Sequence, residues 1–269
     1  MEYVGPFIFN GIRFALGCLV LVPFAWVRRR RAGAGGGQGI VTVGLAAGGV
    51  LFLGASLQQV GIVHTTAGKA GFITGLYVVL VPLLATIWRH RVGPGAWIGA
   101  LLAAAGLYLL SVREGFRISL GDALVLASAF CWAIHVLIIA RWSKRHDVIL
   151  LALLQFATCS VLSLGVAFLT ESFTVQTIRA AGVPILYGGL LSVGIGYTLQ
   201  VVAQRDAPPT AAAILMSLEA VFAVLGGWLI LHETLVPRAM LGCALMLAGV
   251  LLSQIGAGPV SDRVDARVT

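Results

Sequence analysis

An acidic residue in the middle of an apolar stretch is the first candidate for chemistry in this sequence. Glu219 lies nine residues past Thr210 in a run that continues to Leu231, which would place it about 13 Å into a hydrocarbon core of about 30 Å. A carboxylate at that depth is costly unless it is paired or faces water. We therefore expect Glu219 to bind a cationic group of a solute or to carry a coupling proton. The alternative is a structural carboxylate satisfied by a neighbouring helix.

Arg13 is a second ionisable residue inside an apolar stretch, seven residues past Pro6. That depth is too great for an interfacial anchor unless the side chain extends to the headgroups. Its guanidinium could bind the carboxylate of a solute or neutralise Glu219. An arginine at the end of a helix that reaches the headgroups is the alternative.

His135 shares a predicted helix face with Ser128, Cys131 and Trp132, at spacings of seven, four and three residues. Such a face, with Trp132 beside His135, could bind an aromatic or cationic solute, or titrate near neutral pH. A single histidine in a membrane helix also serves as a hydrogen-bonding packing residue, and that interpretation stays open.

The elements that carry these residues must lie in a lipid bilayer. The chain has 269 residues, of which 59% are hydrophobic and only 10% charged, and its mean hydropathy is +1.00. This composition does not give a water-soluble surface. The 18 Lys and Arg fall in short runs between apolar stretches, so no nucleic-acid partner is expected. The four cysteines lack the spacing of a metal site, and we expect no metal and no other cofactor.

Nine apolar stretches approach the roughly 20 residues that a spanning helix needs. They are residues 6–26, 40–62, 67–88, 96–111, 121–140, 149–169, 183–203, 210–231 and 239–255. The predicted fold class is therefore an all-α polytopic membrane protein with nine transmembrane helices.

An internal repeat emerges when the chain is shifted against itself by 142 positions. The shift pairs Phe14 with Phe156, Gly54 with Gly196, Gln58 with Gln200 and Leu76 with Leu218. The pattern predicts a first copy in residues 1–112, a second in 121–256 and a cytoplasmic tail in 257–269. The stretch at 121–140 would map before Met1, so we expect a five-helix unit whose first helix is missing from the first copy. Because five is odd, the copies would be inverted in the membrane.

The repeat adds four candidate residues. Gln58 pairs with Gln200, which follows Tyr197 by three residues, so both halves could present amides to a polar solute. Tyr77 occupies the position of Glu219, which would let one half supply charge and the other an aromatic wall. Hydrogen bonds between helices are the alternative role of the glutamines.

The distribution of Lys and Arg predicts the orientation. If the C-terminus is cytoplasmic, the loops on that side carry 12 of these residues and the loops on the other side carry 5. The positive-inside bias therefore predicts a multi-pass protein of the plasma or inner membrane with a cytoplasmic C-terminus.

Several motifs are distinctive. They are residues 217–223, 231–235 and 242–249 in the second copy, residues 66–72, 76–82 and 99–106 in the first, and the pair Trp132-Ala133. This set resembles the EamA-like branch of the drug/metabolite transporter superfamily. The resemblance implies a ten-helix inverted repeat with both termini cytoplasmic that moves amino acids, sugars or other metabolites, often outward. It also leads us to expect an in-frame apolar segment upstream of Met1.

Together, these features predict a secondary transporter that exports or exchanges a small metabolite by alternating access around a midplane cavity, with proton coupling as an option. Its partners would be a small solute and the lipid bilayer. A non-transporting membrane assembly subunit is the alternative. A membrane-embedded enzyme is disfavoured because the sequence has no HExxH motif, paired carboxylates or Ser/His/Asp grouping.

Overall fold

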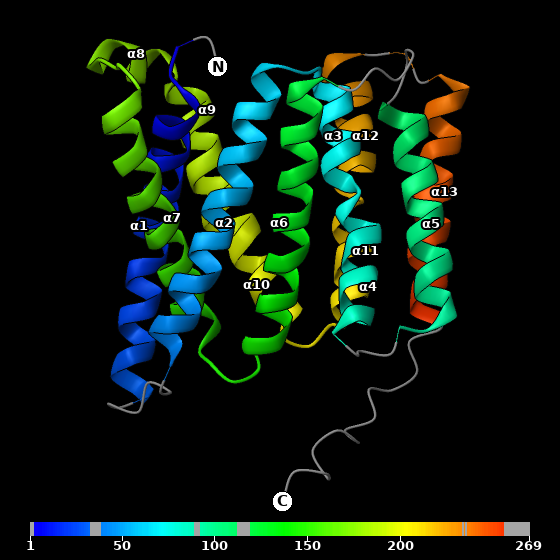
Figure 1. Cartoon of the computed structure of the whole chain (residues 1–269), viewed down its shortest axis with the longest axis horizontal. Coiled ribbons are helices and arrows are strands. Elements are labelled where there is room, and N and C mark those ends of the chain that lie inside the picture. The colour runs from blue at the N-terminus through cyan, green and yellow to red at the C-terminus, as the bar shows by residue number, and fades with distance from the viewer. Residues whose placement is uncertain are drawn as a thin grey trace, which may run out of the picture.

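The computed structural model describes residues 3–32, 39–88, 92–111, 119–232, 234 and 236–255, and their regular structure is entirely helical. Most helices run side by side between the two ends of the molecule, with α1 near one edge of the row and α5 and α13 together at the other (Figure 1). The predicted tail at 257–269 lies outside the described residues.

The helices follow one another along the chain with short connections. The first half contains α1 (Pro6–Ala32), α2 (Ile40–Val63), α3 (Ala67–Gly75), α4 (Tyr77–Ile87) and α5 (Pro94–Ser111). The second half contains α6 (Leu120–Trp142), α7 (Val148–Thr170), α8 (Val175–Ala180), α9 (Gly182–Leu186), the π-helix η1 (Tyr187–Tyr197), α10 (Thr198–Gln204), α11 (Pro209–Met216), α12 (Glu219–Leu231) and α13 (Pro237–Ile255).

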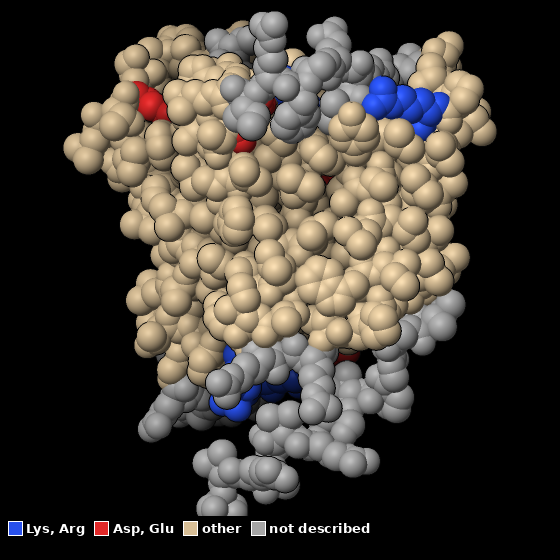
Figure 2. Space-filling view, turned by 45° about the vertical axis from the view of Figure 1, so that its right-hand side comes forward, with Lys and Arg blue, Asp and Glu red and all other residues tan. Residues whose placement is uncertain are grey.

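The described part of the chain has the helices of a multi-pass membrane protein. It contains 7 helical segments that are long and apolar enough to cross a membrane, and two shorter apolar helices, Pro94–Leu110 and Pro237–Ser253. On the face shown in Figure 2, charged side chains gather near the two ends and leave an uncharged band between them. Such a band fits the hydrocarbon region of a bilayer.

Two of the predicted helices are broken, which corrects the expectation of continuous helices at 67–88 and 210–231. The first break falls at Leu76, whose N–H donates to the carbonyl of Ile73 at 3.2 Å. The second falls at 217–218, where the N–H of Leu218 donates to the carbonyl of Leu215 at 3.1 Å. Both are tightened turns with a spacing of three residues, and each divides one apolar span, Gly68–Ile87 or Pro209–Gly226, into two helices. Leu76 and Leu218 are paired by the predicted repeat.

The predicted helix at 183–203 is also not a regular α-helix. Its middle is the 11-residue π-helix η1, which packs along α1. Gly189 permits the contact, because a Cβ atom there would lie 2.6 Å from the Cβ of Leu16. Single π turns are common at functional sites, and one of this length is rare.

Helices α5 and α13 touch through their main chains. A Cβ at Gly99 would lie 2.5 Å from the carbonyl oxygen of Gly249, and one at Gly106 would lie 2.5 Å from that of Gly242. In lipid, where apolar burial does not drive helices together, such close approach is a main source of packing energy.

Helix α1 is fastened to α7 at both ends. The carboxylate of Glu171, just after α7, accepts hydrogen bonds from the N–H groups of Phe7 at 2.9 Å and Ile8 at 2.8 Å. At the other end, Arg28 forms an ion pair with Asp147 at 3.1 Å. The first contact satisfies main-chain donors that the start of α1 cannot satisfy itself.

Buried apolar side chains form two large cores, and each draws on both halves of the sequence. The first core is built from α1, α2, α6, α7, η1 and α10. The second is built from α4, α5, α11, α12 and α13. A smaller cluster of α4, α6 and α11 joins them.

The glycine contact between α5 and α13 gives a first prediction. Gly106→Ala should lower the melting temperature of the purified protein by several degrees, because the new methyl group meets the Gly242 carbonyl and overpacking costs about 1–3 kcal/mol. Gly165→Ala is the matched control, since a Cβ there would have no neighbour within 4 Å. Equal melting temperatures for the two variants would contradict this account of the packing.

Candidate functional site

Glu219 is the first residue of α12, directly after the second helix break. Its side chain is exposed to a cavity of about 310 Å³. The cavity is also lined by Gly68, Gly71, Gly75, Leu107, Leu110, Ser217, Ala220, Ala223 and Val224. A carboxylate in the first turn is stabilised by the helix dipole, and one that faces a cavity can also meet a solute or a proton.

The two helix breaks lie close together. Tyr77 is the first residue of α4, just after the first break, and its side chain is buried. Gly75 at the first break lines the same cavity as Ser217 and Glu219 at the second. The structure therefore brings the residues at the two breaks together.

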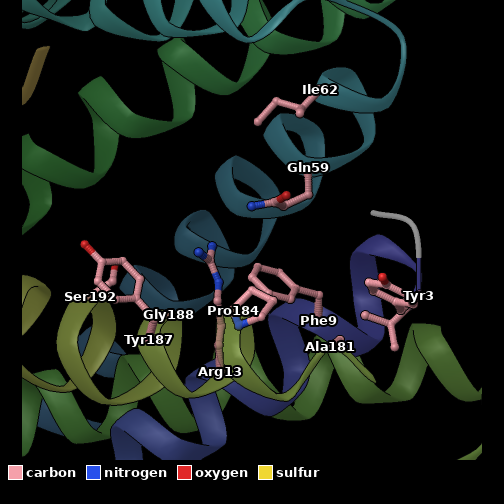
Figure 3. Close-up of a pocket in the computed structure, with 11 residues that line it drawn as sticks. Tyr3, Phe9, Arg13, Gln59, Ile62, Ala181, Pro184, Tyr187, Gly188 and Ser192 are labelled. Atoms are coloured by element: carbon pink, nitrogen blue, oxygen red, sulfur yellow. The ribbon is translucent and has the colours of Figure 1, made fainter. Parts of the chain in front are cut away.

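Arg13 lines a different and larger cavity, of about 560 Å³. Its side chain exposes 8% of its surface and rises from α1 toward α2, on the side where Gln59 extends (Figure 3). The cavity is also lined by Tyr3, Val4, Phe9, Gln59, Ile62, Ala181, Pro184, Tyr187, Gly188 and Ser192. Among the described residues, Arg13 forms no ion pair with Glu219.

The guanidinium of Arg13 is held by aromatic rings. It lies 5.3 Å from the ring centre of Phe9 and 5.1 Å from that of Phe14. Its Nε is buried without a hydrogen-bond partner in the described structure. Cation–π contacts stabilise the group but leave its charge unneutralised, and an unpaired arginine in a membrane helix costs about 2.5–3.5 kcal/mol on insertion scales.

Aromatic side chains surround Tyr197. Its ring centre lies 6.1 Å from that of Phe14, 5.9 Å from that of Trp132 and 6.5 Å from that of Phe156. We call Phe14, Trp132, Phe156 and Tyr197 the aromatic cluster. The guanidinium of Arg13 lies over the ring of Phe14, so the cluster borders that charge.

His135 lines neither of these two cavities. It is buried, with its Nε2 2.7 Å from Oε1 of Gln155 on α7 and its ring edge-on to Trp132 at 6.1 Å. This geometry is that of a hydrogen-bonded packing pair between α6 and α7.

The two glutamines paired by the predicted repeat differ in their surroundings. The Nε2 of Gln58 donates to Oγ1 of Thr74 at 3.2 Å, which links α2 to α3. Gln200 is half-buried on α10. Neither glutamine lines either of the two cavities. The hydrogen bond of Gln58 is of the kind expected if the glutamines hold helices together.

Some residues of the larger cavity were not predicted. Phe9 precedes Arg13 by four residues, a spacing that places both on one helix face, and this signal was available in the sequence. Gln59, Tyr187 and Ser192 had no such signal, because only the packing of α2 and η1 against α1 brings them to Arg13.

Bundled apolar helices, most of them long enough to cross a bilayer, define an integral membrane protein. A model of the EamA-like transporter family matches residues 1–112 and 119–254, and the chain belongs to this family. The chain is therefore a membrane transporter rather than an enzyme.

Individual relatives agree with this assignment. An uncharacterized transporter of Archaeoglobus fulgidus is 32% identical over 254 residues, which cover 94% of this chain and 78% of the relative. The threonine/homoserine exporter RhtA of Escherichia coli K12 is 27% identical over 256 residues, covering 91% and 81%. A crystal structure that is 19% identical shares the fold, with a TM-score of 0.78 and coverage of 94% and 88%.

The His135–Gln155 pair gives a second prediction. Gln155→Leu should destabilise the protein by about 1–3 kcal/mol, because it leaves the buried imidazole nitrogen without its partner. The double variant His135→Leu/Gln155→Leu should recover most of that loss in a thermal-shift measurement, since two apolar side chains leave no unpaired group. A double variant that is stable and reaches the membrane, yet no longer transports, would instead give His135 a role in handling the solute.

Proposed function

We propose that this protein exports a small metabolite by alternating access around a central site at the two helix breaks. The observation that carries the proposal is the position of Glu219 at one break, facing a cavity that Gly75 at the other break also lines. Irregular backbone at membrane depth is tolerated where protein or a water-filled cavity surrounds it. Broken helices of this kind form the solute and ion sites of many secondary transporters.

An inverted pair of repeats is supported by contacts between residues at equivalent positions. Phe14 and Phe156, which the repeat aligns, pack against each other with ring centres 5.9 Å apart. Beyond a one-residue gap the repeat aligns Gly99 with Gly242 and Gly106 with Gly249. The glycine contacts between α5 and α13 are therefore reciprocal, since Gly99 touches Gly249 and Gly106 touches Gly242. An approximate two-fold axis between the copies would produce both features.

The two large cores support alternating access. Each core contains helices of both copies, and two smaller clusters join them, one of α4, α6 and α11 and one of α2, α3 and α6. Two well-packed bundles that share a narrower seam can tilt against each other while each keeps its own packing.

The orientation follows from the basic residues at the two ends. Of the basic residues whose side chains the structure describes, five lie toward the end where α13 finishes, namely Arg28, Arg141, Lys144, Arg145 and Arg205. Three lie toward the other, namely Lys69, Arg179 and Arg238. We infer that the end where α13 finishes faces the cytoplasm and that the protein lies in the cell membrane.

The solute is inferred from the chemistry of Glu219 and from the relatives. RhtA is named as an exporter of threonine and homoserine, which supports an amino acid or similar metabolite here, moved outward. Glu219 would bind the cationic group of that solute or carry a coupling proton, and Tyr77 and Tyr197 would form the wall beside it.

A third prediction tests the carboxylate. Cells that express the wild-type chain should release one or more metabolites above the level of vector-only cells, and Glu219→Gln should remove at least nine-tenths of that release at equal membrane abundance. The reason is that glutamine has a similar shape but neither charge nor a proton to exchange. Metabolite profiling of the medium and quantitative blotting of membranes provide the measurements.

The matched control is Asp206→Asn, which changes an exposed acid in the turn after α10. It should leave the release unchanged. If Glu219→Gln released as much as the wild type, or lost only abundance, the carboxylate would be structural and the proposed site would be wrong.

A further inference from the structure

We propose that the cavity around Arg13 is a binding site for an organic monoanion that has one carboxylate and an apolar or aromatic body. This inference rests on the proposed function and adds to it the chemical class of a solute that the transporter holds. The site is distinct from the cavity at Glu219, since the two cavities share no lining residue.

The charge of the cavity indicates an anion. Arg13 is the one charged side chain among its described lining residues, and it is buried without a hydrogen bond or ion pair to the described residues. The acidic residue that contacts α1, Glu171, already accepts from the main chain of Phe7 and Ile8. A guanidinium prefers a carboxylate partner, which it can bind through two parallel hydrogen bonds.

Neutral groups around Arg13 can complete the recognition of a carboxylate. The amide of Gln59 extends into the same space from α2, and the hydroxyl of Ser192 comes from η1 (Figure 3). The absence of an acidic side chain from the described lining disfavours a zwitterion, because its ammonium group would be desolvated without a counter-charge.

The size and lining of the cavity define the rest of the ligand. A cavity of about 150 Å³ is enough to hold benzene, so about 560 Å³ leaves room for a carboxylate with a ring or a branched chain. Phe9, Val4, Ile62 and Pro184 provide apolar contacts, and Tyr3 and Tyr187 provide aromatic ones. Gly188 opens space beside the guanidinium, since a Cβ there would lie 3.5 Å from Cδ of Arg13.

The test compares three probes of similar size on the full chain in phosphatidylcholine nanodiscs. Phenylacetate carries a carboxylate, phenylacetamide is its neutral analogue and phenylalanine is a zwitterion. Thermal stabilisation as a function of concentration should give an affinity for phenylacetate at least tenfold higher than for either of the others. The same titration on a Glu2→Gln chain removes the acidic residue that precedes Tyr3 in the sequence, and the preference should persist.

Variants assign the effect to Arg13. Arg13→Gln should reduce the affinity for phenylacetate at least tenfold, to that of phenylacetamide, whereas Arg13→Lys should keep a preference for the anion. Arg179→Gln is the charge-matched control on exposed α8 and should bind like the wild type. If Arg13→Gln does not fold, Gly188→Val tests the same site, because the added side chain fills the cavity and should abolish binding.

Glu219→Gln separates this inference from the proposed function. That variant should still bind phenylacetate even though it no longer exports. Equal affinities of the wild type for phenylacetate and phenylacetamide, or unchanged binding by Arg13→Gln, would overturn the inference. Stabilisation by added phosphatidylglycerol without stabilisation by phenylacetate would also overturn it, since Arg13 would then bind a lipid headgroup.

Discussion

Close contact between main chains, made possible by glycine, is the interaction on which this structure depends. In a bilayer the lipid tails are as apolar as leucine, so helices gain little from hiding apolar surface and must gain instead from fit. The contact of α5 with α13 through Gly99, Gly106, Gly242 and Gly249 meets that need. Gly61 does the same between α2 and α6, where a Cβ would lie 2.9 Å from the Gly121 carbonyl oxygen. Helices fixed at such short distances position side chains precisely, which the sites around Arg13 and Glu219 require.

Much of the fold was predictable because the bilayer imposes a simple rule on length and polarity. Six of the nine predicted stretches correspond to continuous helices, from α1 and α2 to α13. The interruptions of the other three stretches were not predicted. The sequence around Leu76 and Leu218, for example, is as apolar as that of a regular membrane helix. The π-helix was equally hidden, because its four glycines also fit ordinary helix packing. These irregularities depend on contacts with other helices, which the hydrophobic pattern of the sequence does not reveal.

The candidate site was likewise predictable only in part. Glu219 and Arg13 could be identified from the sequence, because a charged residue is rare in an apolar stretch. Their separation into two cavities was not visible, and neither was the partner of His135, since Gln155 lies 20 residues away on another helix. The repeat directed attention to Tyr77, which is buried beside the first break, and its role in a solute site stays a prediction. The repeat did not predict the partner of Gln58, whose amide donates a hydrogen bond to Thr74.

The positions of the two charges relative to the two cores connect the fold to transport. Arg13 belongs to a helix of the first core, which α7 holds through Glu171 and Asp147, whereas Glu219 begins a helix of the second. Under the proposed alternating access, each charge would move with its own bundle. Phe14 of the aromatic cluster lies against Arg13, and the cluster packs on the first core. A tilt of one bundle against the other would change the distance between the charges and the cover that the aromatic cluster provides. Neither charge has an ion-pair partner among the described residues, so such a tilt would be coupled to the charge of whatever enters the cavities, because a bound ion changes the electrostatic energy of one arrangement more than that of the other.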